Sequence, residues 1–144
     1  MASTTFSGPI KAGTIKEGSS ANVGSVVMAQ SAVIDIIGAT NESVMARLPA
    51  NSQIVDVILN VSTVSNDSGT ATVQVGTPAD TNAYIPATNV KALGTTRGTL
   101  DTEATNVGNG VARSVLARFI GQNGNGTTGA ATVTVLYIQN NNLS

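Results

Sequence analysis

The chain has no histidine, cysteine or tryptophan, and its 144 residues include only two tyrosines and two phenylalanines. Without histidine or cysteine it cannot form a Ser-His-Asp or Cys-His triad, a His/Cys zinc site, a disulfide or a haem ligand. Charged residues are also scarce, at 10% of the chain against about 25% in an average soluble domain. This composition indicates a structural protein, and we expect no enzyme activity, no catalytic residues, no metal and no cofactor.

The charges nearly balance, with seven Lys and Arg against eight Asp and Glu. A nucleic-acid partner is not expected, because such binding requires a basic surface that displaces counterions from phosphates. A membrane partner is not expected either, because no apolar run reaches the 18 residues of a membrane-spanning helix. The first residues lack the basic start and apolar stretch of a secretory signal, so we expect synthesis in a cytoplasm.

Two parts of the chain differ in composition. Residues 1–22 are mostly Ser, Thr, Gly and Ala, and their pattern predicts an extended arm. Within the arm, Phe6, Pro9 and Ile10 are the candidate partner-binding residues, because an unbound tail would have little use for one of two phenylalanines. A frayed terminus is the alternative. Residues 23–144 contain enough apolar residues for one domain with a hydrophobic core.

Alternating apolar and polar residues predict β-strands through most of this domain. Seven or eight short strands separated by turn residues are typical of an all-β antiparallel sandwich or a jelly-roll-like domain. Residues 83–108 have no clear pattern, and 87–93 are compatible with a helical turn. The clearest strands are expected at 26–36, 44–48, 53–64, 70–75, 111–120 and 131–139.

Connections and core faces follow from the same alternation. The turn residues at 66–69 predict a hairpin between strands 53–64 and 70–75, and the loop before 131–139 predicts another. In strand 53–64 the core face is expected to carry Val55, Val57, Leu59 and Val61.

Several strands are also apolar on the face opposite the predicted core. A two-layer sandwich covers one face of each strand, so the second face needs the arm or another copy of the chain as cover. We therefore favour a homo-oligomer; the alternative is that scattered surface Ile and Leu need no explanation. The residues concerned are Ile54, Ile58, Leu116, Ile120, Leu136 and Ile138.

Residues 124–129 match the G-x-G-x-x-G pattern of dinucleotide-binding loops. That loop needs a helix after it, whereas residues 130–139 have the pattern of a strand. The glycines therefore indicate a flexible hairpin loop, in which glycine and asparagine adopt left-handed conformations easily.

Acidic residues give two weak candidate sites. Asp101 and Glu103 are the only close carboxylate pair, as in a glycosidase, but the chain lacks aromatic platforms for a sugar. Asp67, or Asp80 with Asn82, could supply loop oxygens to calcium. For both loops, a turn held by an Asx hydrogen bond is the favoured interpretation.

Four segments resemble small virion proteins of tailed bacteriophages, in short phrases rather than in a diagnostic motif. The resemblance implies a head decoration, or cement, protein: an all-β unit, commonly trimeric, that binds the major capsid protein of the assembled shell and stabilises it. It also implies a location on the capsid surface, synthesis in the host cytoplasm, and an arm that reaches adjacent subunits. The segments are 5–14 (TFSGPIKAGT), 22–30 (NVGSVVMAQ), 48–57 (LPANSQIVDV) and 131–137 (ATVTVLY).

A carbohydrate- or receptor-binding module of a tail fibre or adhesin is the alternative function. The scarcity of aromatic residues counts against it, because sugar rings usually stack on Trp or Tyr side chains.

Overall fold

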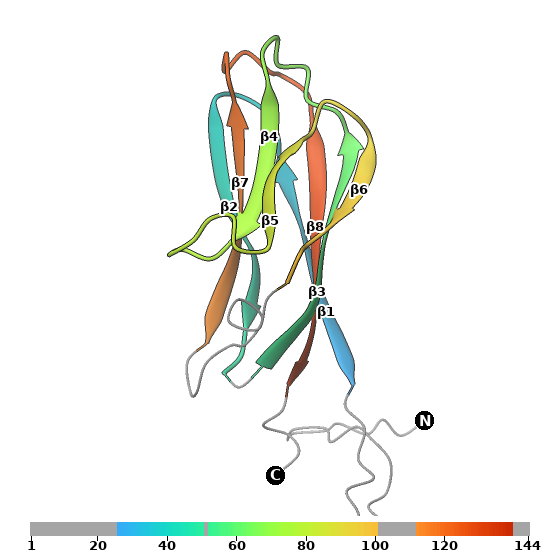
Figure 1. The fold of residues 1–144 in the computed structure, drawn as a ribbon. Coiled ribbons are helices and arrows are strands. Elements are labelled where there is room, and N and C mark those ends of the chain that lie inside the picture. The colour runs from blue at the N-terminus through green and yellow to red at the C-terminus, as the bar shows by residue number, and fades with distance from the viewer. Residues whose placement is uncertain (1–25, 51, 101–111, 140–144) are drawn as a thin grey trace, which may run out of the picture.

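The computed structural model describes residues 26–50, 52–100 and 112–139, which form eight β-strands and their loops, with no helix in these ranges (Figure 1). The predicted arm at 1–22 lies outside the described residues, and so does its boundary with the domain. The strands are β1 (Val27–Asp35), β2 (Thr40–Leu48), β3 (Ser52–Thr63), β4 (Ala71–Gly76), β5 (Ile85–Asn89), β6 (Gly94–Arg97), β7 (Arg113–Gly121) and β8 (Ala130–Gln139).

Two four-stranded antiparallel sheets pack face to face: sheet 1 has the order β1-β8-β3-β6 and sheet 2 the order β2-β7-β4-β5. The second half of the chain folds back on the first, so that β1 pairs with β8, β2 with β7, β3 with β6 and β4 with β5. Pairing of β3 with β8 and of β4 with β7 completes the sheets. Eight strands in this order form a jelly roll. The predicted all-β antiparallel sandwich is confirmed, in its jelly-roll form.

The two predicted hairpins are wrong. The turn at 66–69 carries the chain from β3 in sheet 1 to β4 in sheet 2, and the loop after β7 carries it from sheet 2 to β8 in sheet 1. Alternation indicates which side chains of a strand face inward, but it does not indicate which strand lies beside it. Both loops are long enough to cross between the layers, which a two-residue hairpin turn is not.

A β-bulge in β3 changes which residues face the core. The pairing with β8 shifts between Ile54 and Asp56, and an extra residue at such a point reverses the alternation before it. Ile54 is therefore buried, with 2% of its surface exposed, whereas Val55 is 47% exposed. The predicted core face is correct for Val57, Leu59 and Val61 and wrong for Val55.

Residues 83–108, which gave no clear pattern, contain β5 and β6. The helical turn considered at 87–93 is wrong, because the first three of these residues end β5 and the rest lead into β6. Both strands are very short, and Pro86 lies inside β5. Proline interrupts the strand signal in a sequence but is tolerated in an edge strand such as β5.

The core lies between the sheets and consists mainly of β-branched and small side chains. Their burial stabilises the fold by roughly 1.5–3 kcal/mol for each large side chain. Tyr84 and Phe119 are the largest fully buried side chains. Sheet 1 contributes Ile34, Val57, Leu59, Val133 and Val135, and sheet 2 contributes Val73, Val75, Val115 and Ala117.

One side chain fastens the two sheets together where β1 and β2 run side by side. The Gln30 side chain accepts the Arg47 backbone N–H at its Oε1 (3.0 Å) and donates from its Nε2 to the Arg47 carbonyl (2.9 Å). The same Nε2 lies 3.1 Å from the Tyr137 hydroxyl. The side-chain amide thus takes the place that a neighbouring strand's peptide group would occupy. It satisfies the N–H and carbonyl groups of Arg47 at the edge of β2.

Candidate functional site

Several residues singled out from the sequence lie outside the described residues: Phe6, Pro9 and Ile10 of the arm, and the carboxylate pair Asp101 and Glu103. Within the ranges that the structure describes, no group of three or more His, Cys, Asp or Glu side chains could hold a metal ion. The same ranges contain no helix long and apolar enough to cross a membrane. The remaining candidates are the loop end of the jelly roll and the outer faces of the sheets.

Asp67 organises the loop end of the molecule. Only 1% of its surface is exposed. Its Oδ1 accepts the backbone N–H groups of Gly69 (2.7 Å) and Asn123 (3.3 Å), and its Oδ2 accepts that of Asn125 (3.2 Å). The carboxylate therefore ties the β3–β4 loop to the β7–β8 loop.

These contacts decide the charge state of Asp67 and its fitness for calcium. Burial alone would raise the pKa of the carboxyl, but hydrogen bonds from four backbone N–H groups outweigh it and hold the pKa below its usual value. A carboxylate surrounded by N–H donors has little lone-pair capacity left for a cation. The favoured turn interpretation is confirmed at both loops, because Gly69 N–H binds Asp67 and Asn82 N–H binds Asp80.

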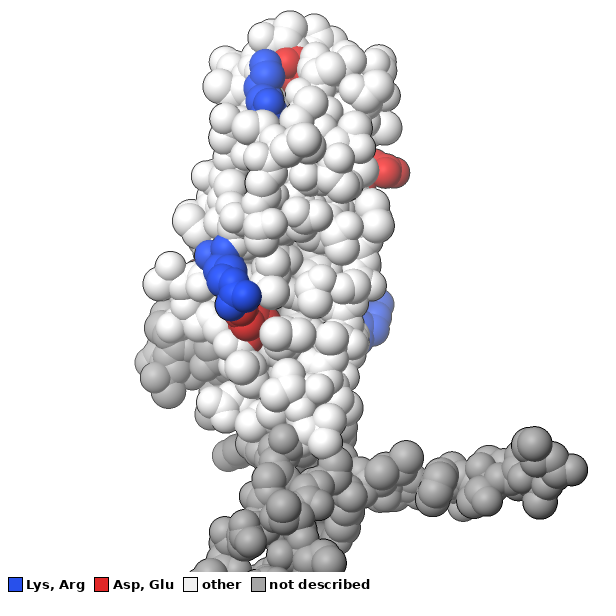
Figure 2. Space-filling model, turned by 90° about the vertical axis from the view of Figure 1, so that its right-hand side faces the viewer, with Lys and Arg blue, Asp and Glu red and all other residues white. Residues whose placement is uncertain are grey.

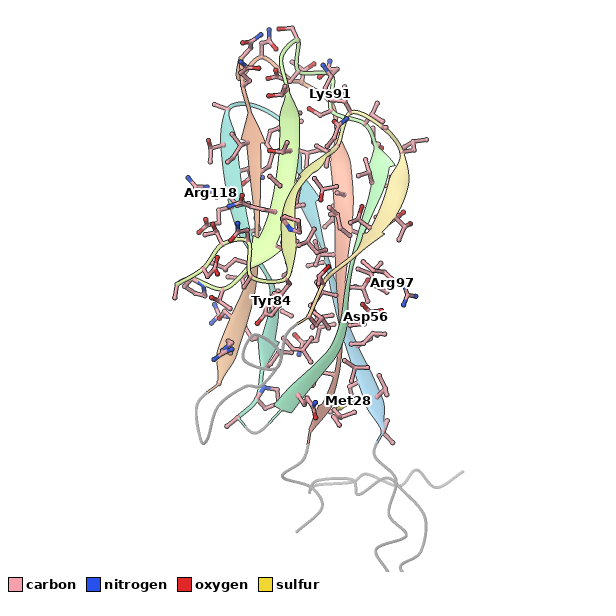
Figure 3. The ribbon with its side chains drawn as sticks, viewed as in Figure 1. Met28, Asp56, Tyr84, Lys91, Arg97 and Arg118 are labelled. Carbon is pink, nitrogen blue, oxygen red and sulfur yellow. The ribbon has the colours of Figure 1, made fainter. Side chains whose placement is uncertain are left out.

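Other polar side chains extend this network across a third loop. Lys91, which follows β5, donates from Nζ to the carbonyls of Asp67 (2.7 Å) and Gly69 (2.8 Å), and Figure 3 shows it near this end of the molecule. Asn66 Oδ1 accepts the N–H groups of Thr127 and Thr128. Neither the hairpin nor the flexibility predicted for 124–129 is therefore observed, since that loop is anchored along its length.

The outer face of sheet 1 changes from apolar to polar along the strands. At the end where β1 begins and β8 ends, Val27 lies beside Ile138 and Ala29 beside Leu136. On the other side of β8, Val55 and Ile58 of β3 add apolar side chains. The β3 residues paired with Ile138 and Leu136 are Gln53 and Asp56, and Ile58 is paired with Thr134. We call these six residues the apolar half-face: Val27, Ala29, Val55, Ile58, Leu136 and Ile138.

The other half of the same face is covered by hydroxyl and amide groups. Ser31 and Thr134 are hydrogen-bonded neighbours, and the Thr95 hydroxyl donates to Asn60 Oδ1 at 3.0 Å. Val33, 61% exposed, stands here beside Thr132. The change occurs within a single sheet with one set of strands, so the apolar character belongs to one end of the face and is not a general property of the strands.

An ion pair stands within the apolar half-face, on its β3 side, because Asp56 is paired with Leu136. Arg97 Nη1 of β6 lies 2.7 Å from Asp56 Oδ2 in the bulge, and Asp56 Oδ1 accepts the Val57 N–H at 2.9 Å. Figure 2 looks at the side from which Arg97 projects in Figure 3, and it shows few charged groups among the described residues on this side. Large uncharged apolar surfaces on soluble proteins mark contact sites.

The outer face of sheet 2 also carries apolar side chains. Leu116 is nearly buried, while Val44 and Ile120 are about two-fifths exposed, and Arg118 stands between Leu116 and Ile120 on β7. Of the six residues expected opposite the core, Ile54 belongs to the core because of the bulge. The other five lie on outer faces: Leu116 and Ile120 on sheet 2, and Ile58, Leu136 and Ile138 on sheet 1.

Sequence reasoning missed Val55 as a surface residue. Its alternation with Val57 and Leu59 is regular, and Asp56 in the bulge stands where regular alternation also places a polar residue. Nothing in the sequence therefore distinguishes Val55 from a core residue.

The fold defines the class of the protein: an eight-stranded jelly roll, an architecture shared by viral capsid and lectin domains among others. No family model matches the chain, and no curated protein sequence does.

Solved structures of bacteriophage capsids contain chains with the same fold. One, in the acidic stable capsid structure of the Helicobacter pylori bacteriophage KHP30, is similar with a TM-score of 0.62 and 21% identity, over 81% of this chain and 90% of that chain. One in the capsid asymmetric unit of cyanophage Pam1 has a TM-score of 0.60 and 19% identity, over 88% and 94%. One in the capsid of Ralstonia phage GP4 has a TM-score of 0.56 and 19% identity, over 88% and 90%. In each case the two chains are similar in length and alike over most of the fold.

Proposed function

We propose that this protein is a non-enzymatic structural component of a bacteriophage virion, specifically a decoration or cement protein that binds the assembled shell of major capsid protein and stabilises it. The observation that carries the proposal is the near-full-length likeness to chains of similar size in three phage capsids. The likeness covers 81–88% of this chain and 90–94% of the capsid chains, which supports a role for this domain in a shell.

The surface of the domain supports this function. A cement protein needs a large, pre-formed contact surface and no titratable chemistry. The apolar half-face is such a surface, and the strand pairing and loop hydrogen bonds hold the domain in one shape. Many copies on one symmetric shell then add their weak contacts together.

The position of the chain ends suggests how the domain sits on the shell. β1 begins and β8 ends at the same end of the jelly roll, opposite the loops tied by Asp67 (Figure 1). The arm precedes β1, so we place the end with the apolar half-face toward the capsid and the loop end outward. In this arrangement Phe6, Pro9 and Ile10 anchor the arm on the major capsid protein or on a neighbouring copy, and the copies form a trimer.

Deletion of residues 2–20 tests the proposal. The deletion should abolish co-sedimentation with phage heads while the circular dichroism spectrum and melting temperature of the domain stay unchanged, because it leaves all eight strands of the described residues intact. Unaltered binding of the shortened chain would show that the arm is not the anchor. Failure of the full chain to bind heads would refute the decoration function itself.

Images of virions with and without this protein provide a second test. Density on the capsid surface should disappear with the protein. Loss of density from the tail or neck instead, together with hits on a glycan array, would favour the carbohydrate-binding alternative. Among the described residues the aromatic rings of Tyr84, Phe119 and Tyr137 are buried, which leaves no exposed platform there for a sugar.

A further inference from the structure

We propose that the apolar half-face of one copy binds the N-terminal segment of a neighbouring copy. This inference rests on the proposed function, in which the segment at residues 1–22 anchors the protein, and it identifies the surface that receives the segment. The copies would then be linked by exchanged segments rather than by contact between domains alone.

The size and chemistry of the half-face fit an extended apolar segment. From the row of Val27 to the row of Ser31 it is four residues long, or about 13 Å, and it spans three strands, or about 10 Å. An extended chain places residues four apart on the same side, also about 13 Å apart. Phe6 and Ile10 have this spacing, with only Ser, Gly and Pro between them.

Charge complementarity agrees with this occupant. None of the six residues named for the half-face is titratable, and Asp56, which lies among them opposite Leu136, is paired with Arg97. Residues 1–10 carry no charged side chain. The contact therefore buries apolar surface without burying an unpaired side-chain charge.

The length and direction of the chain favour a neighbouring copy over the chain's own half-face. The segment joins β1 next to Val27, at a corner of the half-face, and β1 then runs along that face. To bind its own half-face, the segment would have to turn back between Ile10 and Val27. Twenty-five residues in extended form reach up to roughly 80 Å, far beyond a face about 13 Å long, so the segment can cross to the next copy.

Disulfide cross-linking of full-length chains tests the exchange, because the chain has no cysteine of its own. Ile10→Cys is introduced in one tagged variant and Val55→Cys in a second variant of different mass, and the two are co-expressed and oxidised. We expect a covalent heterodimer on non-reducing gels, several-fold more abundant than with Val33→Cys as the partner. Val33 is a more exposed valine of the same sheet face (61% against 47% for Val55), but it lies in the polar half.

Other outcomes would overturn the inference. Equal cross-linking to both valine positions, or none to Val55→Cys, refutes it, and so does a disulfide formed within one chain of the Ile10→Cys/Val55→Cys double variant. If Val55→Cys fails to fold by circular dichroism, Ala29→Cys at an exposed position of the half-face replaces it. Head binding is scored separately on the unmodified chain. Heads bound without cross-links refute the exchange alone, whereas cross-links without head binding refute the decoration function alone.

Discussion

A single carboxylate holds the loop end of this molecule together. Asp67 is buried, ionised and bound by backbone N–H groups from two loops, while Lys91 binds the Asp67 backbone from a third. Charge-assisted hydrogen bonds of this kind are stronger than neutral ones. The residue that the sequence offered as a calcium ligand therefore acts as an internal anion for the protein's own backbone.

The folded-state pKa of Asp67, lowered below its unfolded value of about 3.9, makes stability depend on pH. The carboxylate contributes its full stabilisation above the unfolded pKa, and this contribution is lost as the pH falls through the folded pKa. Asp67→Asn should lower the melting temperature at neutral pH by several degrees, because the amide's NH₂ faces N–H donors. It should also flatten the decline of the melting temperature below about pH 4, because the amide does not titrate.

Thermal melts across pH check this expectation. Asp35→Asn, which removes the same charge from an exposed position of β1, serves as the control. An Asp67→Asn profile that coincides with that of Asp35→Asn would contradict the role assigned to Asp67.

At the scale of the strand, the bulge in β3 decides which of two adjacent apolar residues supports the core. Ile54→Ala should lower the free energy of unfolding by about 2–4 kcal/mol, because it removes buried methyl groups and leaves a cavity. Val55→Ala should cost less than about 0.5–1 kcal/mol, as expected for a surface position. Urea denaturation of the two variants measures both, and the reverse ranking would mean that the strand has no bulge.

The contact between β1 and β2, which we call the seam, is made by the hydrogen bonds of Gln30 to Arg47 and gives a second prediction at the scale of the strand. Gln30→Met keeps the length of the side chain but removes its bonds to Arg47 and Tyr137, and it should lower the free energy of unfolding by about 1–2 kcal/mol. Gln53→Met, at an exposed position of β3, should change it little. Equal effects of the two substitutions in chemical denaturation would show that the seam adds no stability.

The strands themselves could be predicted from the sequence far better than their partners. Val73 and Val75 in β4, and Val133 and Val135 in β8, alternate with polar residues, and all four face the core as expected. Pairing depends on contacts between residues far apart in the chain, which a local pattern does not record. The bulge at Val55 and the short strand containing Pro86 were not predicted, for a related reason. Both depart from regular alternation, and only the neighbouring strand explains the departure.

The candidate site was predictable only in its general character. Apolar residues on both faces of several strands indicated that a surface would be covered, and Ile58, Leu136 and Ile138 do lie on an outer face. That they lie with Val27, Ala29 and Val55 on one half of this face depends on the order β1-β8-β3, which became visible only in the fold.

For the molecule as a whole, β8 is the strand on which sheet 1 depends. It lies between β1 and β3 and contributes Val133, Val135 and Tyr137 to the core. A chain that ends at residue 129 should therefore fail to fold in either sheet, with loss of the β-sheet circular dichroism signal and of cooperative melting. A truncated chain that keeps a cooperative transition would mean that sheet 2 is stable on its own.

The pairing of the first strand with the last also has a consequence for synthesis on the ribosome. Val27 pairs with Ile138, and at translation rates of about 5–20 residues per second the interval between them is on the order of ten seconds. Throughout that time β1 has no partner strand, in a chain with few charges to keep it apart from others. The pairing of β1 with β8 can therefore form only after residue 138 has been synthesised, so sheet 1 is completed late in synthesis.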